Sequence, residues 1–109
     1  MQPALRVTDP KSLNVITDVI HDRWFEVDDV AIEEGRKCLR IPFRPDWVLE
    51  ISEVESYQLE ETEGVGRYDF NKFAYSESDR TLMISTGVPL VFRVTVASLD
   101  VSLSELSPA

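Results

Sequence analysis

The sequence predicts a single α+β domain, in which one N-terminal amphipathic helix packs on a curved, mainly antiparallel meander sheet of about six or seven strands. Three observations indicate this fold class. The chain has 109 residues, of which 43% are hydrophobic and 28% are charged, and this is the size and composition of one globular domain. Apolar residues follow a helical period only near the N-terminus and alternate from residue 27 onward. Short turn signals separate the alternating segments, which favours up-and-down connections over parallel crossovers.

The helix is expected over residues 10 to 24. Asp9 followed by Pro10 has the pattern of a helix N-cap with proline at the first helical position. The apolar residues of this segment then recur at steps of three and four: Leu13, Ile16, Ile20 and Trp24. This spacing predicts one apolar face. We therefore expect Trp24 to end that face and to be buried against the sheet.

Alternation and turn residues fix the register of two hairpins at the start of the sheet. A two-residue turn at Gly35-Arg36 predicts three opposed pairs: Ile32 with Leu39, Val30 with Ile41, and Glu34 with Lys37. A three-residue loop over residues 44 to 46 predicts four more: Phe43 with Trp47, Ile41 with Leu49, Leu39 with Ile51, and Arg40 with Glu50. Both registers place apolar residues on one face.

The second half of the chain predicts further strands and one irregularity. A bulge is expected between Ser52 and Ser56, because an unbroken strand would turn Glu53 and Glu55 towards the core. The expected strands after it cover residues 68–75, 81–86, 90–96 and 99–103. They are separated by turns at 64–66 and 87–89 and by a kink at 97–98. Residues 104–109 are expected to form a fraying tail.

Composition argues against several classes of function. The net charge of −9 disfavours binding to nucleic acid and to anionic membranes, since both require a basic surface. The apolar runs are too short to span a bilayer, and no secretory signal is visible, so a cytoplasmic location is expected. Cys38 is the single cysteine and His21 the single histidine. Hence we expect no structural metal site, no cofactor and no histidine-dependent nucleophile.

The most unusual feature is the distribution of charge. Residues 45 to 66 contain no Lys or Arg and seven carboxylates: Asp46, Glu50, Glu53, Glu55, Glu60, Glu61 and Glu63. Part of this charge is expected to meet the basic strand before it, through Arg40 opposite Glu50. The rest predicts a small non-enzymatic binding or regulatory protein, of an inhibitor or immunity-like kind, whose acidic face binds a basic protein. A solubility role is the competing interpretation.

Two other hypotheses stay open. The first is a small-molecule pocket between helix and sheet, or an exposed aromatic binding surface, formed by Trp24, Phe25, Phe43, Trp47, Tyr68, Phe70, Phe73 and Tyr75. The second is an enzyme that uses carboxylates, although adjacent acids on a strand point to opposite faces. An exposed sheet edge also offers a surface for a homodimer.

Overall fold

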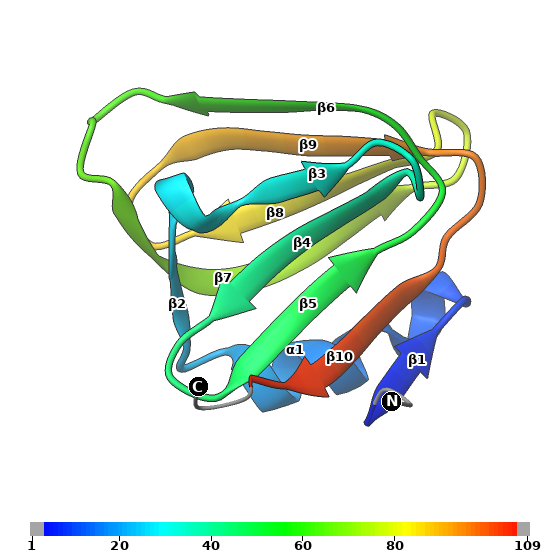
Figure 1. Cartoon of the computed structure of the whole chain (residues 1–109), viewed down its shortest axis with the longest axis horizontal. Helices are drawn as coiled ribbons and strands as arrows, with labels where there is room; N and C mark the ends of the chain where they lie inside the picture. The colour runs from blue at the N-terminus through cyan, green and yellow to red at the C-terminus, as the bar shows by residue number, and fades with distance from the viewer. Residues whose placement is uncertain (1–3, 107–109) are drawn as a thin grey trace.

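The computed structural model describes residues 4 to 106, which form two curled antiparallel sheets and one α-helix (Figure 1). The first sheet has the spatial order β1 (Leu5–Val7), β10 (Val101–Glu105), β5 (Trp47–Ile51), β4 (Cys38–Phe43) and β3 (Ala31–Glu33). The second has the order β2 (Trp24–Glu26), β7 (Arg67–Ser76), β8 (Thr81–Thr86), β9 (Leu90–Val96) and β6 (Val54–Glu61). Helix α1 covers Leu13–Ile20, and 3₁₀ turns cover Pro10–Ser12 and Val27–Asp29.

The antiparallel, sheet-rich fold with an N-terminal helix is confirmed, but the described residues contain ten strands rather than six or seven. The pattern of apolar residues does not predict β1 before the helix or β2 directly after it. Each has three residues, which is too short to show alternation. Both are held by partners far away in the sequence, β10 and β7 respectively.

The connections also differ from a simple meander. β3–β4–β5 and β7–β8–β9 are consecutive neighbours, but β6 leaves the first sheet and pairs with β9, and β10 returns to pair with β5. The chain changes sheet at Glu53, which has a φ of 56°. The register of β6 then shifts between Val54 and Ser56. This is the expected bulge, and it leaves Glu55 exposed.

The register of both predicted hairpins is confirmed where the strands pair. Ile32 lies opposite Leu39, and all four predicted pairs of β4 with β5 are present. The first turn is nevertheless longer than two residues. Arg36 N donates to Glu33 O and Lys37 N donates to Glu34 O. Lys37, with a φ of 51°, takes the left-handed position instead of the glycine.

The predicted ends of the helix and of the last strand need correction. Asp9 accepts a hydrogen bond from Lys11 N at 3.0 Å, as expected of a cap. The α-helix itself ends at Ile20, whose carbonyl accepts from Arg23 N at 2.8 Å. At the other end of the chain β10 runs to Glu105, so the expected tail is too long, and its residues 107–109 lie outside the described part.

Trp24 is not the last residue of the helical face. It begins β2 and is only half-buried, and the Arg67 guanidinium lies 3.6 Å from the centroid of its ring. Phe25 takes the core position instead, with none of its surface exposed. Trp24 follows Ile20 by four residues, which matches the helical spacing, but the helix has already ended at Ile20. On strand β2 it is Phe25, not Trp24, that faces the core.

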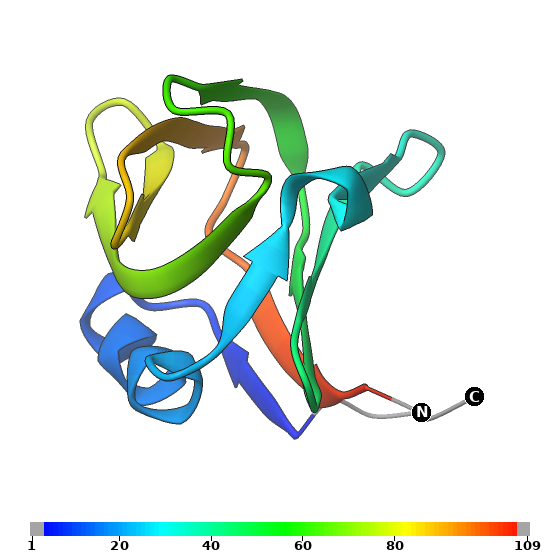
Figure 2. The ribbon, with the colours of Figure 1, turned by 90° about the vertical axis from the view of Figure 1, so that its left-hand side faces the viewer.

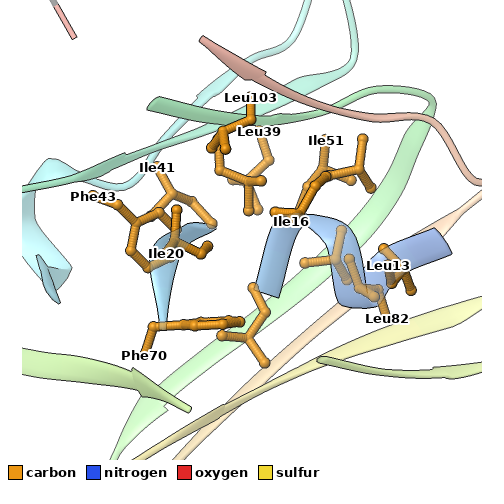
Figure 3. Close-up of a cluster of buried hydrophobic side chains, with 14 of the residues drawn as sticks. Leu13, Ile16, Ile20, Leu39, Ile41, Phe43, Ile51, Phe70, Leu82 and Leu103 are labelled. Atoms are coloured by element: carbon orange, nitrogen blue, oxygen red, sulfur yellow. The ribbon is translucent and has the colours of Figure 1, made fainter. Parts of the chain in front are cut away.

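The core lies between the two sheets and is completed by α1 (Figure 3). Leu13, Ile16 and Ile20 of the helix are buried, as their spacing predicts, against residues of both sheets. With eight residues, α1 is short, and no helix within residues 4–106 has the length and apolar character needed to span a membrane.

Rings from four strands form the aromatic part of the core. The centroid of Phe25 lies 5.5 Å from that of Phe43, 6.0 Å from Tyr68 and 5.8 Å from Phe92. Phe43 contacts Phe70 in turn, at 5.5 Å and with an interplanar angle of 81°. Such edge-to-face contacts add to the free energy of burial.

We predict that Phe25→Ala destabilises the protein by about 3 to 5 kcal/mol, because it removes a fully buried ring that contacts three others. Trp24→Ala should cost about 1 to 2 kcal/mol, since that ring is half-buried and loses one cation–π contact. Unfolding in guanidinium chloride measures both free energies. A larger loss for Trp24→Ala than for Phe25→Ala would contradict the assignment.

Candidate functional site

The seven carboxylates between residues 45 and 66 do not form one continuous face. Asp46 lies in the β4–β5 turn, at the opposite end of the molecule from β6 in both views (Figures 1 and 2). Glu50 lies on β5 opposite Arg40, as predicted, and accepts a weak hydrogen bond from the Cys38 Sγ at 3.6 Å. The other five carboxylates lie on β6 and its two flanking loops.

Several of these carboxylates have partners within the fold. Arg23 donates to Asp46 at 2.7 Å, and this hydrogen bond holds the pKa of Asp46 below its usual range. Glu55 is 3.3 Å from the Arg80 guanidinium. Glu61 accepts hydrogen bonds from Gly66 N and from the Tyr68 hydroxyl, both at 2.8 Å. These contacts anchor loops and strand ends.

Tyr68 illustrates the structural role of Glu61. Its ring belongs to the core and its hydroxyl reaches the carboxylate. Burial, followed by the hydrogen bond to Glu61 and the charge of that carboxylate, raises the pKa of the Tyr68 hydroxyl. The phenol therefore remains a hydrogen-bond donor at neutral pH.

Glu53, Glu60 and Glu63 have a different environment. All three are exposed, and within residues 4 to 106 none of them forms an ion pair. They flank or lie on β6. Of the predicted acidic face, these three carboxylates are the ones available to another molecule.

An open groove lies between the edge strands β3 and β6, along the N-terminal half of β6 that follows Glu53. At one end Val54 N, at the start of β6, donates to Lys37 O of the β3–β4 turn at 2.9 Å. The groove has a volume of about 410 Å³ and is lined by Ile32, Glu34, Lys37, Val54, Glu55, Ser56 and Tyr57. We call it the β3–β6 groove.

The β3–β6 groove exposes the core-facing side of β6. Tyr57 lies opposite Val94, which has no exposed surface, and therefore faces the same way. Yet 42% of Tyr57 is exposed. Leu59, opposite the buried Phe92, is half-buried. A core-facing tyrosine with this exposure indicates that the layer above β6 is incomplete.

A second groove lies between the N-terminal part of the helical segment and β7. It has a volume of about 400 Å³ and is lined by Pro10, Lys11, Leu13, Asn14, Thr17, Lys72, Phe73 and Tyr75. Neither lysine forms an ion pair within the described residues. We call it the α1–β7 groove. The sequence gives no sign of it, because Lys11 and Lys72 converge only when the helix packs on the sheet.

The predicted aromatic residues fall into two groups. Phe25, Phe43, Tyr68 and Phe70 are almost fully buried and pack against one another in the core. Trp24 and Trp47 are half-buried at the periphery of the sheets. Phe73 and Tyr75 line the α1–β7 groove and are half-buried. The α1–β7 groove also lies between helix and sheet, but of the eight predicted aromatic residues only Phe73 and Tyr75 line it.

The groups that could support metal binding or nucleophilic chemistry are dispersed. Within residues 4 to 106 no three His, Cys, Asp or Glu side chains gather closely enough to hold a metal ion. His21 is exposed beside Asp22, with 3.0 Å between Nδ1 and the carboxylate. Burial, aided by the charge of Glu50, raises the pKa of the Cys38 thiol to about 11. This thiol is therefore protonated, and a poor nucleophile, at neutral pH.

Comparison of the chain with protein-family models, with curated proteins and with solved structures found no match.

We predict that Cys38 reacts with iodoacetamide in the native protein with a pH midpoint near 11. With that pKa, roughly one thiol in 1,000 is ionised at pH 8. Glu50→Gln should lower the midpoint, because it removes a negative charge that opposes the thiolate. The rate of alkylation as a function of pH, with denatured protein as reference, measures this. A native midpoint near that of a free cysteine would contradict it.

Proposed function

We propose that this chain is a non-enzymatic binding protein whose acidic β6 surface binds a basic region of another protein. The observation that carries the proposal is the position of Glu53, Glu60 and Glu63 on and beside β6. These carboxylates are exposed and form no ion pair within the described residues, and the N-terminal half of the same strand lines an open groove. Charge and an accessible apolar surface occur together there, which is the composition of a specific protein-binding site rather than of a surface that is merely solvated.

Electrostatics supports a basic partner. β6 and its flanking loops carry five carboxylates (Glu53, Glu55, Glu60, Glu61 and Glu63). Among the described residues, direct ion pairing neutralises only Glu55, through Arg80. Like charges at this density repel one another and cost the fold some stability. Cations of a partner would relieve this repulsion and would also speed its approach.

The arrangement of the same acids is less suited to catalysis. Glu60 and Glu61 are adjacent on β6 and point to opposite sides, as strand geometry requires. Both are exposed, but Glu61 accepts hydrogen bonds from Gly66 and Tyr68, whereas Glu60 forms no ion pair within the described residues. A pair of carboxylates sharing one substrate would need both on the same side. Binding therefore accounts for these residues better than hydrolysis does.

A second candidate function is favoured by the α1–β7 groove, which combines two lysines with Phe73 and Tyr75. Such a groove suits a small aromatic carboxylate, whose charge the lysines would contact and whose ring would lie against Phe73 and Tyr75. In a chain of net charge −9, two unpaired lysines at one groove are a local reversal of sign.

For the protein-binding function, we predict that replacing Glu53, Glu60 and Glu63 by Gln slows association with a basic partner. The partner would be identified by affinity capture from the source organism, and its association measured by surface plasmon resonance between about 50 and 500 mM salt. For the wild type, association should slow steeply as salt rises, while dissociation changes less. The melting temperature of the triple variant should stay close to that of the wild type.

The matched control is Asp18→Asn, Asp22→Asn, Glu105→Gln, which removes three exposed charges on the helical segment and β10, away from β6. It has the same net charge as the first variant, so it separates a local site from overall charge. Equal slowing by the two variants, or association that is insensitive to salt, would show that β6 is not the binding surface.

For the small-molecule function, we predict that benzoate binds the α1–β7 groove and that neutral benzamide does not. Lys11→Met with Lys72→Met should weaken benzoate binding by about fivefold or more, because two charge contacts are lost. Lys37→Met, in the other groove, is the control. NMR titration should shift the amide resonances of Lys72 and Phe73. Equal responses to benzoate and benzamide would reject the anion site.

A further inference from the structure

We propose that the β3–β6 groove binds an extended segment of the partner as an added β-strand, hydrogen-bonded to the free edge of β6. The segment carries alternating apolar residues and Lys or Arg. This inference rests on the proposed protein-binding function and specifies how the partner is held.

The backbone of β6 offers the hydrogen-bonding groups that an added strand needs. Val96 N donates to Arg80 O, so this residue of β9 is directed towards β8. Because backbone direction alternates along a strand, Val94 and Phe92 are directed the same way. Their partners on β6, Tyr57 and Leu59, therefore point their N–H and C=O groups away from β9, along the free edge of the sheet that Tyr57 shares with the groove.

The side chains of β6 define what should lie above it. Tyr57 and Leu59 face inward, and Ile32 approaches from the β3 side of the groove. An added strand would place every second side chain over these residues and bury apolar surface that is now exposed. Those positions of the bound segment should therefore be apolar.

The intervening positions of the segment would face outward, beside the outward residues of β6. Glu60 is among these, and Glu53 and Glu63 lie at the two ends of the strand. Lys or Arg at these positions would face carboxylates that have no ion-pair partner within the described residues. Lys37 would repel a basic residue of the segment. It lines the end of the groove where Val54 N is bonded to Lys37 O. The basic residues should therefore be concentrated towards the Glu60 end.

Charge also argues against a second copy of this chain as the occupant. Pairing two β6 edges would bring Glu60 and its neighbours close to the same carboxylates of the other copy, and like charges across a ladder are destabilising. The length of β6 limits the segment as well. β6 has eight residues, and at its first residue Val54 N is already bonded to Lys37 O, so we expect about four to six residues of the partner to pair with it.

The test uses a defined peptide, acetyl-Lys-Val-Lys-Val-Lys-Val-Lys-amide, and two analogues of the same charge. In one analogue every valine is N-methylated, and in the other every lysine except the first is N-methylated. Residues that share a backbone direction alternate along a strand, so one set of N–H groups faces β6 and the other does not. The unmodified peptide should shift the amide resonances of Tyr57 and Leu59 of the ¹⁵N-labelled protein and slow their hydrogen exchange. One analogue should bind at least tenfold more weakly than the other.

Two outcomes would overturn the inference in distinguishable ways. If both analogues bind as tightly as the unmodified peptide, side-chain charge alone holds the segment, and strand addition is wrong while the acidic binding surface stands. If the unmodified peptide leaves Tyr57 and Leu59 unperturbed at millimolar concentration, the groove is not the site. The triple Gln variant then decides separately whether the β6 carboxylates bind a partner at all.

Discussion

The contact of Phe25 with Phe43 is the interaction on which the arrangement of the two sheets depends. Phe25 belongs to β2 of the second sheet, and Phe43 belongs to β4 of the first. Their rings meet edge to face, and beside them Arg44 N donates to Trp24 O at 2.7 Å across the same junction. The sheets are therefore joined closely at this corner. Away from it their curvature carries them apart, and the space between must be filled by something else.

The space between the two sheets is filled on one side of the structure and left open on the other. On one side α1 lies between β1 and β7 and inserts Leu13, Ile16 and Ile20 between the sheets (Figure 2). On the other side β3 and β6 diverge, and within the described residues no helix covers the opening. The exposure of Tyr57 follows from this asymmetry. A side chain that would be core if the sheets met is left at the wall of a groove.

The features predicted correctly from the sequence are those that depend on residues close together in the chain. The β4–β5 register follows from alternation and from the residues of one loop, and the bulge after β5 follows from the need to keep Glu55 out of the core. Trp24 shows the limit of such reasoning, because a spacing of four residues extends the helical pattern into a strand that is held by β7. The short strands β1 and β2 are likewise defined by distant partners.

The candidate sites depend on distant contacts even more strongly. Seven acids in one stretch of sequence predicted one face, but the change of sheet at Glu53 separates Asp46 and Glu50 from the rest. Three of the carboxylates then have partners within the fold: Asp46 binds Arg23, Glu55 binds Arg80, and Glu61 binds Tyr68. No pattern along the chain reveals which three stay free, and the convergence of Lys11 with Lys72 is equally invisible before the helix packs.

The position of β10 between β1 and β5 has a consequence for how the chain is made. Ribosomal synthesis delivers β10 after the other four strands of the first sheet, so that sheet stays incomplete until residues 101–105 emerge. β6 likewise lacks its neighbour until β9 is made. During that interval the edge of β6 is open to pairing with neighbouring nascent chains. Its glutamates act as gatekeepers in this period, since a charged edge resists β-aggregation. The same carboxylates, whose mutual repulsion costs the finished fold some stability, thus disfavour such pairing in the unfinished protein.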